Sequence, residues 1–362
     1  MTEKTSQFLE ELGWNSYFQE SFQSFEVSGF IPARVISEYK NSYQVNSEYG
    51  ELSAKISGKM QYQARTGDQY PSVGDWVAIK LQDDETKGII QAILPRKSKF
   101  SRKAAGGKTE EQVVAANVDT VFIVNGLDGG RNFNLRRIER YLTLAWNSNA
   151  VPVIILNKMD LCPNVNDFIR SVESIARDVP IYPVSAKEKT GMDALRRYVT
   201  KGKTVAFLGS SGVGKSALIN TLLGTERQEI REVRKGDRQG RHTTTRRELI
   251  VLPDGGAVID TPGMRELQMW ADDNDLGSTF YEIETLAKNC RFNDCQHDNE
   301  PGCAIRTAIR QGNLDSARLE SYLKLQRELR HLMTREDTNA RLEERAKWKK
   351  ISQWAKELRK QD

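Results

Sequence analysis

The spacing of hydrophobic residues changes several times along the chain. Over residues 1–26, apolar residues recur at three- and four-residue spacings, which predicts a short amphipathic helix that docks as an appendage. Residues 27–95 instead hold short segments rich in Val, Ile and Tyr, separated by turn residues such as Gly50 and Gly74. We expect a small closed barrel, either of the oligonucleotide/oligosaccharide-binding (OB) type or SH3-like. The five predicted strands cover 30–39, 43–49, 52–57, 75–81 and 88–94.

From residue 118 the pattern alternates between short, nearly continuous apolar segments and helical spacing. This alternation is typical of an α/β domain whose parallel sheet is covered by helices on both faces. The apolar segments cover 121–124, 151–156, 181–184, 205–208 and 257–259. Helical spacing covers 135–145, 168–175, 192–198 and 217–223.

The regions around these two patterns differ in composition. Residues 96–117 are basic and contain glycine, so we expect a linker, either a flexible connector or a loop that lies against nucleic acid. Residues 276–303 are rich in cysteine and turn residues, and helical spacing returns from residue 304. The predicted domains are 1–26, a helical appendage; 27–98, the barrel; 99–275, the linker and the α/β domain; and 276–362, a cysteine-rich helical domain.

Composition limits the class of protein. With 362 residues, of which 38% are hydrophobic and 28% charged, the chain is expected to be soluble and to hold several domains. No segment approaches the ~20 apolar residues of a membrane span, and the first residues do not resemble a secretory signal. Four cysteines are too few for a disulfide scaffold, so we expect a cytoplasmic protein. Residues 304–362 hold 15 Lys or Arg against 9 Asp or Glu, which suggests either a polyanion partner or a solvated helical tail.

The clearest motif is a phosphate-binding loop. Residues 209–216 match G-x-x-x-x-G-K-S/T, and they follow a predicted strand and precede a predicted helix, as this motif requires. The glycines allow backbone N–H groups to surround phosphate oxygens. We expect Lys215 to reach the β- and γ-phosphates and the Ser216 hydroxyl to bind Mg²⁺. The predicted nucleotide-binding residues here are Gly209, Ser210, Ser211, Gly212, Val213, Gly214, Lys215, Ser216 and Ala217.

A second phosphate motif, Asp260-Thr261-Pro262-Gly263, follows the predicted strand 257–259. The Asp260 carboxylate can hold the Mg²⁺ shell, and the Gly263 N–H can contact the γ-phosphate. Between the two motifs lies a basic segment with three consecutive threonines. One of them is expected to be the second hydroxyl ligand of Mg²⁺. We favour Thr244 over its neighbours Thr243 and Thr245.

The residue that positions the attacking water is not in its usual place. Ras-like enzymes use a Gln directly after the glycine of the second phosphate motif, but here that residue is Met264. Unaided hydrolysis should therefore be slow. The substitute must come from elsewhere in the chain or from a partner. His242, beside the threonines, is the internal catalytic candidate, although it could equally contact RNA or shape its loop.

Two further motifs predict that the base is guanine. Asn157-Lys158-Met159-Asp160 and Ser185-Ala186-Lys187 each follow a predicted strand, where open α/β sheets bind ligands. An aspartate carboxylate can accept hydrogen bonds from guanine N1–H and N2–H, and adenine offers neither donor. We expect Asn157 to brace its loop and the Lys158 stem to pack on the base. The backbone of the second motif is expected to meet guanine O6.

The order of these motifs is unusual. Ordinary GTPases carry the phosphate loop first, whereas here the base motifs precede it. Joining the usual termini and opening new ones elsewhere gives the same sheet, since domain termini often lie close together. The sequence therefore predicts a circularly permuted domain. The second phosphate motif then runs directly into the C-terminal region, so γ-phosphate sensing could be transmitted there.

Cys290, Cys295, His297 and Cys303 form the pattern C-x₄-C-x-H-x₅-C. Three thiolates and one imidazole make a closed tetrahedral set for one structural Zn²⁺, which leaves no position for water. The alternatives are buried thiols beside an unrelated histidine and, less favoured, an iron–sulfur centre.

In this order, the motifs resemble the bacterial ribosome small-subunit-dependent GTPase A family over roughly residues 27–330. The resemblance implies a multidomain fold with an OB-type barrel, a circularly permuted P-loop α/β GTPase domain and a helical zinc-binding C-terminal domain. It also implies GTP hydrolysis to GDP and phosphate, stimulated by the small (30S) ribosomal subunit during its late maturation, and contact with ribosomal RNA. We expect GTP or GDP, Mg²⁺ and one Zn²⁺ as ligands, a monomeric chain and no membrane partner.

Two other functions fit parts of the pattern. One is an RNA-binding module that uses the nucleotide only as a ligand or stress sensor. The other is a GTPase that acts on the large subunit or on a membrane-targeting complex. GTP turnover in the presence of ribosomal subunits distinguishes the RNA-binding module from a GTPase. Co-sedimentation with isolated small and large subunits distinguishes a GTPase of the small subunit from one with another partner.

Overall fold

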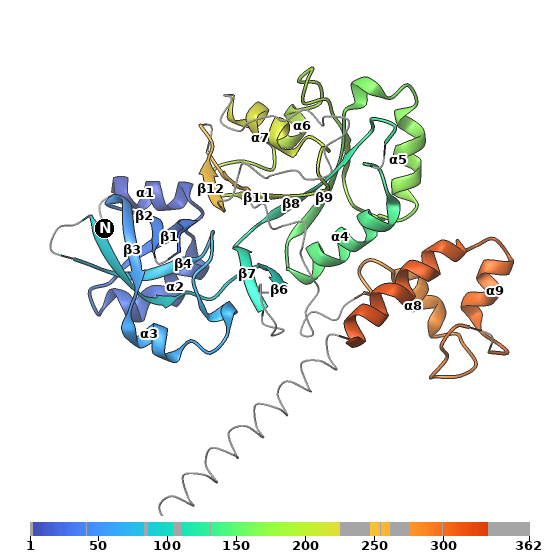
Figure 1. The fold of residues 1–362 in the computed structure, drawn as a ribbon, viewed down its shortest axis with the longest axis horizontal. Helices are drawn as coiled ribbons and strands as arrows, with labels where there is room; N and C mark the ends of the chain where they lie inside the picture. Colours follow the sequence, from blue (N-terminus) through green and yellow to red (C-terminus); the bar gives the residue numbers. More distant parts are fainter. Residues whose placement is uncertain are drawn as a thin grey trace, which may run out of the picture. The chain divides into compact units, whose positions relative to one another are not determined.

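The structure is a computed structural model. It describes residues 3–40, 42–82, 86–103, 111–130, 132–224, 247–253, 255–260, 276–298 and 300–331. The chain divides into two compact units (Figure 1). The first unit comprises residues 1–104 and 110–268, and the second comprises 105–109 and 269–362.

A closed five-stranded barrel lies in the first unit, as predicted (Figure 1). Its strand order is β1-β2-β3-β5-β4, with β4 pairing back onto β1 and β3 parallel to β5. This Greek-key order decides for the OB type. The strands are β1 (Ile31–Glu38), β2 (Tyr43–Ser47), β3 (Gly50–Ile56), β4 (Trp76–Leu81) and β5 (Lys87–Ile93). Between β3 and β4 lie α3 (Gly58–Gln63) and the 3₁₀ turn η1 (Gly67–Gln69).

The N-terminal segment forms two helices, α1 (Glu3–Glu11) and α2 (Ser16–Glu26), so the prediction of a single helix was wrong. The Asn15 side chain accepts a hydrogen bond from the Tyr17 N–H and so caps α2. Trp14, between the helices, is buried and meets the Trp76 ring edge to face, with ring centroids 4.8 Å apart. The two helices therefore complete an apolar core with the barrel.

A buried arginine joins the barrel to its neighbours. Arg34 of β1 is 1% exposed, and its guanidinium donates hydrogen bonds to the carbonyls of Leu12, Gly74 and Asn117. Burial lowers the pKa of Arg34 to about 10, opposed by the charges of Asp119 and Asp75, so the group stays charged at neutral pH. One side chain thus ties the N-terminal helices, the barrel and the start of the α/β domain together.

The α/β domain contains the sheet order β10-β9-β8-β11-β13-β12. Its first five strands are parallel, as expected. β12 runs antiparallel to β13, so the prediction of an all-parallel sheet was wrong at this edge. The strands are β8 (Thr120–Gly126), β9 (Val151–Asn157), β10 (Ile181–Pro183), β11 (Thr204–Leu208), β12 (Glu248–Val251) and β13 (Ala257–Asp260). The helices are α4 (Leu135–Asn147), α5 (Val165–Glu173), α6 (Asp193–Arg196) and α7 (Lys215–Leu223), with the 3₁₀ turn η2 (Met159–Leu161).

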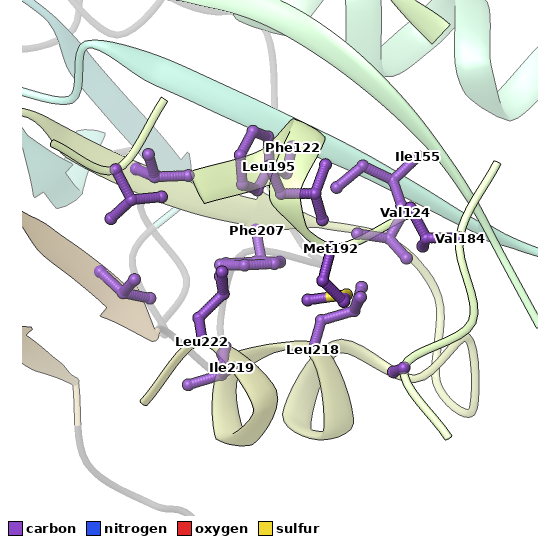
Figure 2. Packing of buried hydrophobic residues seen from close by; sticks show 14 of the residues in the cluster. Phe122, Val124, Ile155, Val184, Met192, Leu195, Phe207, Leu218, Ile219 and Leu222 are labelled. Atoms are coloured by element: carbon purple, nitrogen blue, oxygen red, sulfur yellow. The ribbon is translucent and has the colours of Figure 1, made fainter. Parts of the chain in front are cut away.

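The helix that follows the phosphate loop is anchored by its apolar side. Figure 2 shows Leu218, Ile219 and Leu222 of α7 pointing toward residues of the sheet. Phe207 and Phe122 meet edge to face there, with ring centroids 5.3 Å apart. Each fully buried aliphatic side chain contributes about 1.5–3 kcal/mol of transfer free energy. This packing fixes where the N-terminus of α7 points.

The barrel and the α/β sheet form one hydrogen-bonded surface of eleven strands, because β1 pairs with β12. Ser37 of β1 lies opposite Glu248, which in turn lies opposite Asp260 at the end of β13. Arg247, just before β12, forms an ion pair with Glu38 of the barrel at 2.9 Å.

The predicted linker holds a two-stranded antiparallel sheet, made of β6 (Lys99–Lys103) and β7 (Glu111–Ala116). The interpretation as a flexible connector was therefore wrong for these residues, and the proposed contact with nucleic acid stays a prediction. The many basic residues made the strand pattern of this segment hard to recognise in the sequence, although Phe100 and Val113 are buried.

The second unit is helical. It contains α8 (Tyr281–Ala287), α9 (Ala304–Arg310) and a further helical stretch over residues 316–331. Its core includes Phe280, Ile283 and Ile305, all fully buried. Within the described part of the chain, no helix has the length and apolar character needed to cross a membrane.

Candidate functional site

The predicted base and phosphate motifs gather at one edge of the sheet. β9 ends at Asn157, β10 leads to Ser185, β11 leads to Gly209 and β13 ends at Asp260. These strands are parallel and lie close together in the sheet, with only β8 between β9 and β11. Their carboxyl ends therefore face the same side, which is where such sheets bind ligands.

The phosphate loop is closely packed from both sides. Gly214, the N-cap of α7, has φ +95°, and a Cβ there would lie 2.2 Å from Nδ2 of Asn157. A Cβ on Gly209 would lie 2.5 Å from the Val124 carbonyl oxygen. The Lys215 ammonium donates to the carbonyls of Gly209 and Ser210 at 2.7 and 2.8 Å. Side chains in place of these two glycines would therefore clash with their surroundings, and the lysine is held across the loop.

Asn157 links the base motifs to the phosphate loop. Its Nδ2 donates to the Val213 carbonyl at 2.9 Å, and its Oδ1 accepts from the Ala186 N–H at 3.1 Å. The side chain is 1% exposed. One amide thus fixes the spacing of three motifs that are separate in the sequence, which is the bracing role expected of it.

The carboxylate expected to bind guanine is oriented by the second base motif. Ser185 Oγ donates to Asp160 Oδ1 at 2.7 Å and accepts from the Glu188 N–H at 3.1 Å. The Met159 N–H donates to the Val184 carbonyl at 3.1 Å. These contacts set the direction of the carboxylate before any base arrives.

The structure also shows a group that the sequence analysis missed. Asp128, two residues after β8, accepts a hydrogen bond from the Lys158 ammonium at 2.6 Å. In the sequence, Asp128 is marked only by its position just after a buried strand, β8, whose neighbours β9 and β11 lead into predicted motifs. A position just beyond a buried strand does not by itself indicate a role.

The remaining predicted residues fall into two groups. Ser216 and Ala217 lie in the first turn of α7, Asp260 is the last residue of β13, and all three are half-buried. A half-buried hydroxyl and a half-buried carboxylate at this edge suit an oxygen-binding ion such as Mg²⁺. His242, Thr244 and Gly263 lie outside the described residues.

The cysteine-rich region brings its four predicted ligands together. The ligand atoms of Cys290, Cys295, His297 and Cys303 all lie within 4.8 Å of one another. Nδ1 of His297 is 3.7 Å from the sulfurs of Cys290 and Cys303, and these sulfurs are 4.0 Å apart. Tetrahedral zinc with these ligands needs separations of about 3.5–3.8 Å. The two Nδ1–sulfur distances meet this requirement, and the wider separations, up to 4.8 Å, exceed it by about 1 Å at most. Three sulfurs and one Nδ1 are a donor set that Zn²⁺ binds, so the residues fit this ion with Nδ1 as the histidine donor.

Contacts around this cluster orient the ligands. Cys303 is the N-cap of α9, and its sulfur accepts from the Arg306 N–H at 3.5 Å. Arg306 Nε also donates to the His297 carbonyl at 2.8 Å, and His297 itself has φ +60°. Such outer contacts hold metal ligands in a fixed direction.

Comparisons with known proteins agree with this geometry. A sequence model of the RsgA GTPase family matches residues 93–270. The "Small ribosomal subunit biogenesis GTPase RsgA" of Opitutus terrae is 47% identical over 354 residues, which cover 95% of this chain and 96% of that protein. This chain belongs to the RsgA GTPase family. It is therefore a GTP hydrolase, as its motifs predicted.

Other RsgA relatives extend the match over both units. The protein of the same name from Syntrophotalea carbinolica is 42% identical and covers 98% of each chain. The crystal structure of YjeQ from Thermotoga maritima has a TM-score of 0.62 and 29% identity, covering 83% of this chain and 98% of that one.

Two further comparisons concern the fold. YloQ, described as a circularly permuted GTPase, has a TM-score of 0.59 and 24% identity, which supports the permuted fold alone. It covers 83% of this chain and 96% of its own. A model of the ABC transporter family also matches residues 192–361, a span that holds the phosphate loop but neither base motif.

Proposed function

We propose that this RsgA GTPase acts in late maturation of the small (30S) ribosomal subunit in the cytoplasm. The subunit binds the GTP form and stimulates hydrolysis to GDP and phosphate, after which the GDP form leaves. The observation that carries the nucleotide assignment is the Asn157 amide, which joins both base motifs to the phosphate loop. The ribosomal assignment rests on relatives named for small-subunit biogenesis that match the chain over nearly its full length.

The proposed site divides its work among these elements. Asp160, oriented by Ser185, reads the guanine edge, and the phosphate loop with Lys215 holds the phosphates. Ser216, Thr244 and Asp260 are the proposed Mg²⁺ ligands. When bound, Mg²⁺ neutralises charge that develops on the phosphates. The proposed zinc site is structural, because its four ligands leave no position for water.

The proposed RNA contact is supported by exposed aromatic rings on the barrel. Tyr62 on α3 is 92% exposed, and Tyr49 in the turn between β2 and β3 is 55% exposed. Aromatic side chains on OB folds can stack on unpaired bases at about 1–3 kcal/mol per base. The proposed form of the protein is a monomer that has no membrane partner.

The test is GTP turnover by the protein alone, with isolated small subunits and with isolated large subunits. We expect stimulation of at least about 10-fold by small subunits only, since completing a catalytic site supplies about 10³–10⁵-fold in other GTPases. Equal stimulation by both subunits would contradict the proposed partner. Binding of GTP without turnover in any mixture would favour a nucleotide-sensing RNA-binding module.

Replacing His242 with alanine is expected to keep GDP affinity and to remove subunit-stimulated hydrolysis, because no glutamine follows Gly263 to position the water. The measurement is phosphate release in single-turnover reactions with saturating small subunits. His331→Ala is the matched control, since His331 is exposed at the end of the last described helical stretch. Unchanged stimulated turnover in His242→Ala would remove this residue from the mechanism.

A further inference from the structure

The Asp128 carboxylate stands opposite the first base motif. Its Oδ2 accepts hydrogen bonds from the Lys158 ammonium at 2.6 Å and from the Asn132 amide at 2.8 Å. Its Oδ1 is buried and has no hydrogen-bond partner among the described residues. Lys158 is thus the only cation in the described part of the chain that forms an ion pair with this carboxylate.

The backbone places this pair against the nucleotide site. The Leu127 N–H donates to the Asn157 carbonyl at 2.8 Å, so the residues just before Asp128 and Lys158 are joined. A Cβ on Gly126 would lie 3.5 Å from Asp128 Oδ1 and 3.6 Å from the Cα of Val213. Val213 is the phosphate-loop residue whose carbonyl accepts from Asn157. The carboxylate therefore lies beside the base motif and near the phosphate loop.

The backbone of Lys158 has an unusual conformation. Its φ of +66° lies in the left-handed region, which residues with a Cβ rarely adopt. With its backbone fixed in this way and its ammonium held by Asp128, the stem of the lysine is constrained at both ends. The proposed function places this stem on the face of the guanine base.

The pKa of Asp128 and the burial of both side chains support a stable ion pair between Asp128 and Lys158. Burial alone would raise the pKa of Asp128, but the hydrogen bonds from Lys158 and Asn132 and the charge of Lys158 lower it below its usual value. The two side chains are 19% and 26% exposed, so water screens the pair less than a surface pair. The carboxylate is thus charged at neutral pH.

We propose that Asp128 is a positioning residue for guanine recognition, which holds the Lys158 ammonium so that the lysine stem lies along the base. This inference rests on the proposed function, since it takes the first base motif as the guanine site. Asp128 touches neither the phosphates nor the attacking water in this proposal. It acts on base affinity through Lys158.

The test compares two ligands that use different parts of the site. GDP, as a fluorescent analogue, contacts both the base motif and the phosphate loop, whereas inorganic pyrophosphate contacts only the loop. We expect Asp128→Ala to weaken GDP binding about 10-fold, in line with the loss of a charged hydrogen bond, and to change pyrophosphate binding less than about twofold. Asp128→Asn keeps an acceptor without the charge and should fall between Asp128→Ala and the natural protein.

A double-mutant cycle shows whether the effect passes through Lys158. In the Lys158→Ala background, Asp128→Ala should cause no further loss of GDP affinity. Asp167→Ala is the matched control, because it removes an ion pair with Arg170 at 2.5 Å on the exposed face of α5 and should leave both affinities unchanged. Thermal melting of each variant separates weak binding from loss of fold.

Three results would overturn the inference. Equal weakening of GDP and pyrophosphate would make Asp128 a support of the phosphate loop. Unchanged or tighter GDP binding would show that Lys158 does not need the carboxylate, and additive losses in the cycle would separate the two residues. Failure of the proposed function has a different signature, since the natural protein would then bind ADP as well as GDP.

Discussion

Gly214→Ala is expected to abolish nucleotide binding while the sheet stays folded. The new Cβ would lie 2.2 Å from Asn157 Nδ2, at a backbone φ of +95° that residues with a Cβ rarely adopt. The clash must displace either the phosphate loop or the one amide that joins it to the base motifs. We expect a loss of GDP affinity of at least about 100-fold, equivalent to about 3 kcal/mol. Fluorescent GDP titration measures it.

The matched control lies at the other end of the same helix. Gly224 also has a positive φ, +70°, but a Cβ there meets nothing within 4 Å. Gly224→Ala therefore carries the backbone cost of about 1 kcal/mol without the clash. It should lower the melting temperature slightly and leave GDP affinity within about twofold. Normal GDP binding by Gly214→Ala would show that contact between Asn157 and the loop is not required.

Removal of zinc is expected to unfold the second unit and to spare GDP binding by the first. Among the described residues of the second unit, those that are fully buried and apolar, such as Phe280, Ile283 and Ile305, are few. In zinc-finger peptides a structural zinc site supplies about 10–16 kcal/mol of folding free energy. Cys303→Ser should act like a chelator, because it removes one thiolate ligand, while the serine hydroxyl can still cap α9. Limited proteolysis and far-ultraviolet circular dichroism measure the loss.

Cys162 provides the control for this experiment. It is half-buried beside the first base motif and does not belong to the cluster. Cys162→Ser should keep one zinc per chain and full resistance of the second unit to protease. Unchanged circular dichroism together with unchanged protease resistance of residues 269–362 after complete chelation would contradict a structural role for the metal.

Much of the fold could be predicted because its strands carry strong local patterns. The segment predicted at 75–81 is β4, Trp76–Leu81, and the segment at 151–156 is β9, Val151–Asn157. β12 could not be found in this way. It has only four residues, and it is held by partners from two different domains, so its stability comes from tertiary pairing.

In the site too, short continuous motifs could be predicted, whereas contacts between residues far apart in the sequence could not. Spacing alone identified the phosphate loop and the base motifs, since each is a short continuous segment. Asp128 could not be identified, because its partner Lys158 is 30 residues away and only the sheet brings them together. Trp14 was missed for a related reason: it lies between two helices, outside any helical period, and packs on Trp76 of the barrel.

The pairing of β1 with β12 also has a consequence for how the protein is made. Ser37 is synthesised more than 200 residues before Glu248, its partner across the two strands. At about 5–20 residues per second, the N-terminal strand waits on the order of 10–40 s for this neighbour. During that interval, the part of β1 that later pairs with β12 has unpaired backbone groups. The ion pair between Glu38 and Arg247 cannot form until Arg247 has been synthesised. Nascent chains of this protein therefore pass through a stage in which the barrel can form but its join to the nucleotide-binding sheet cannot.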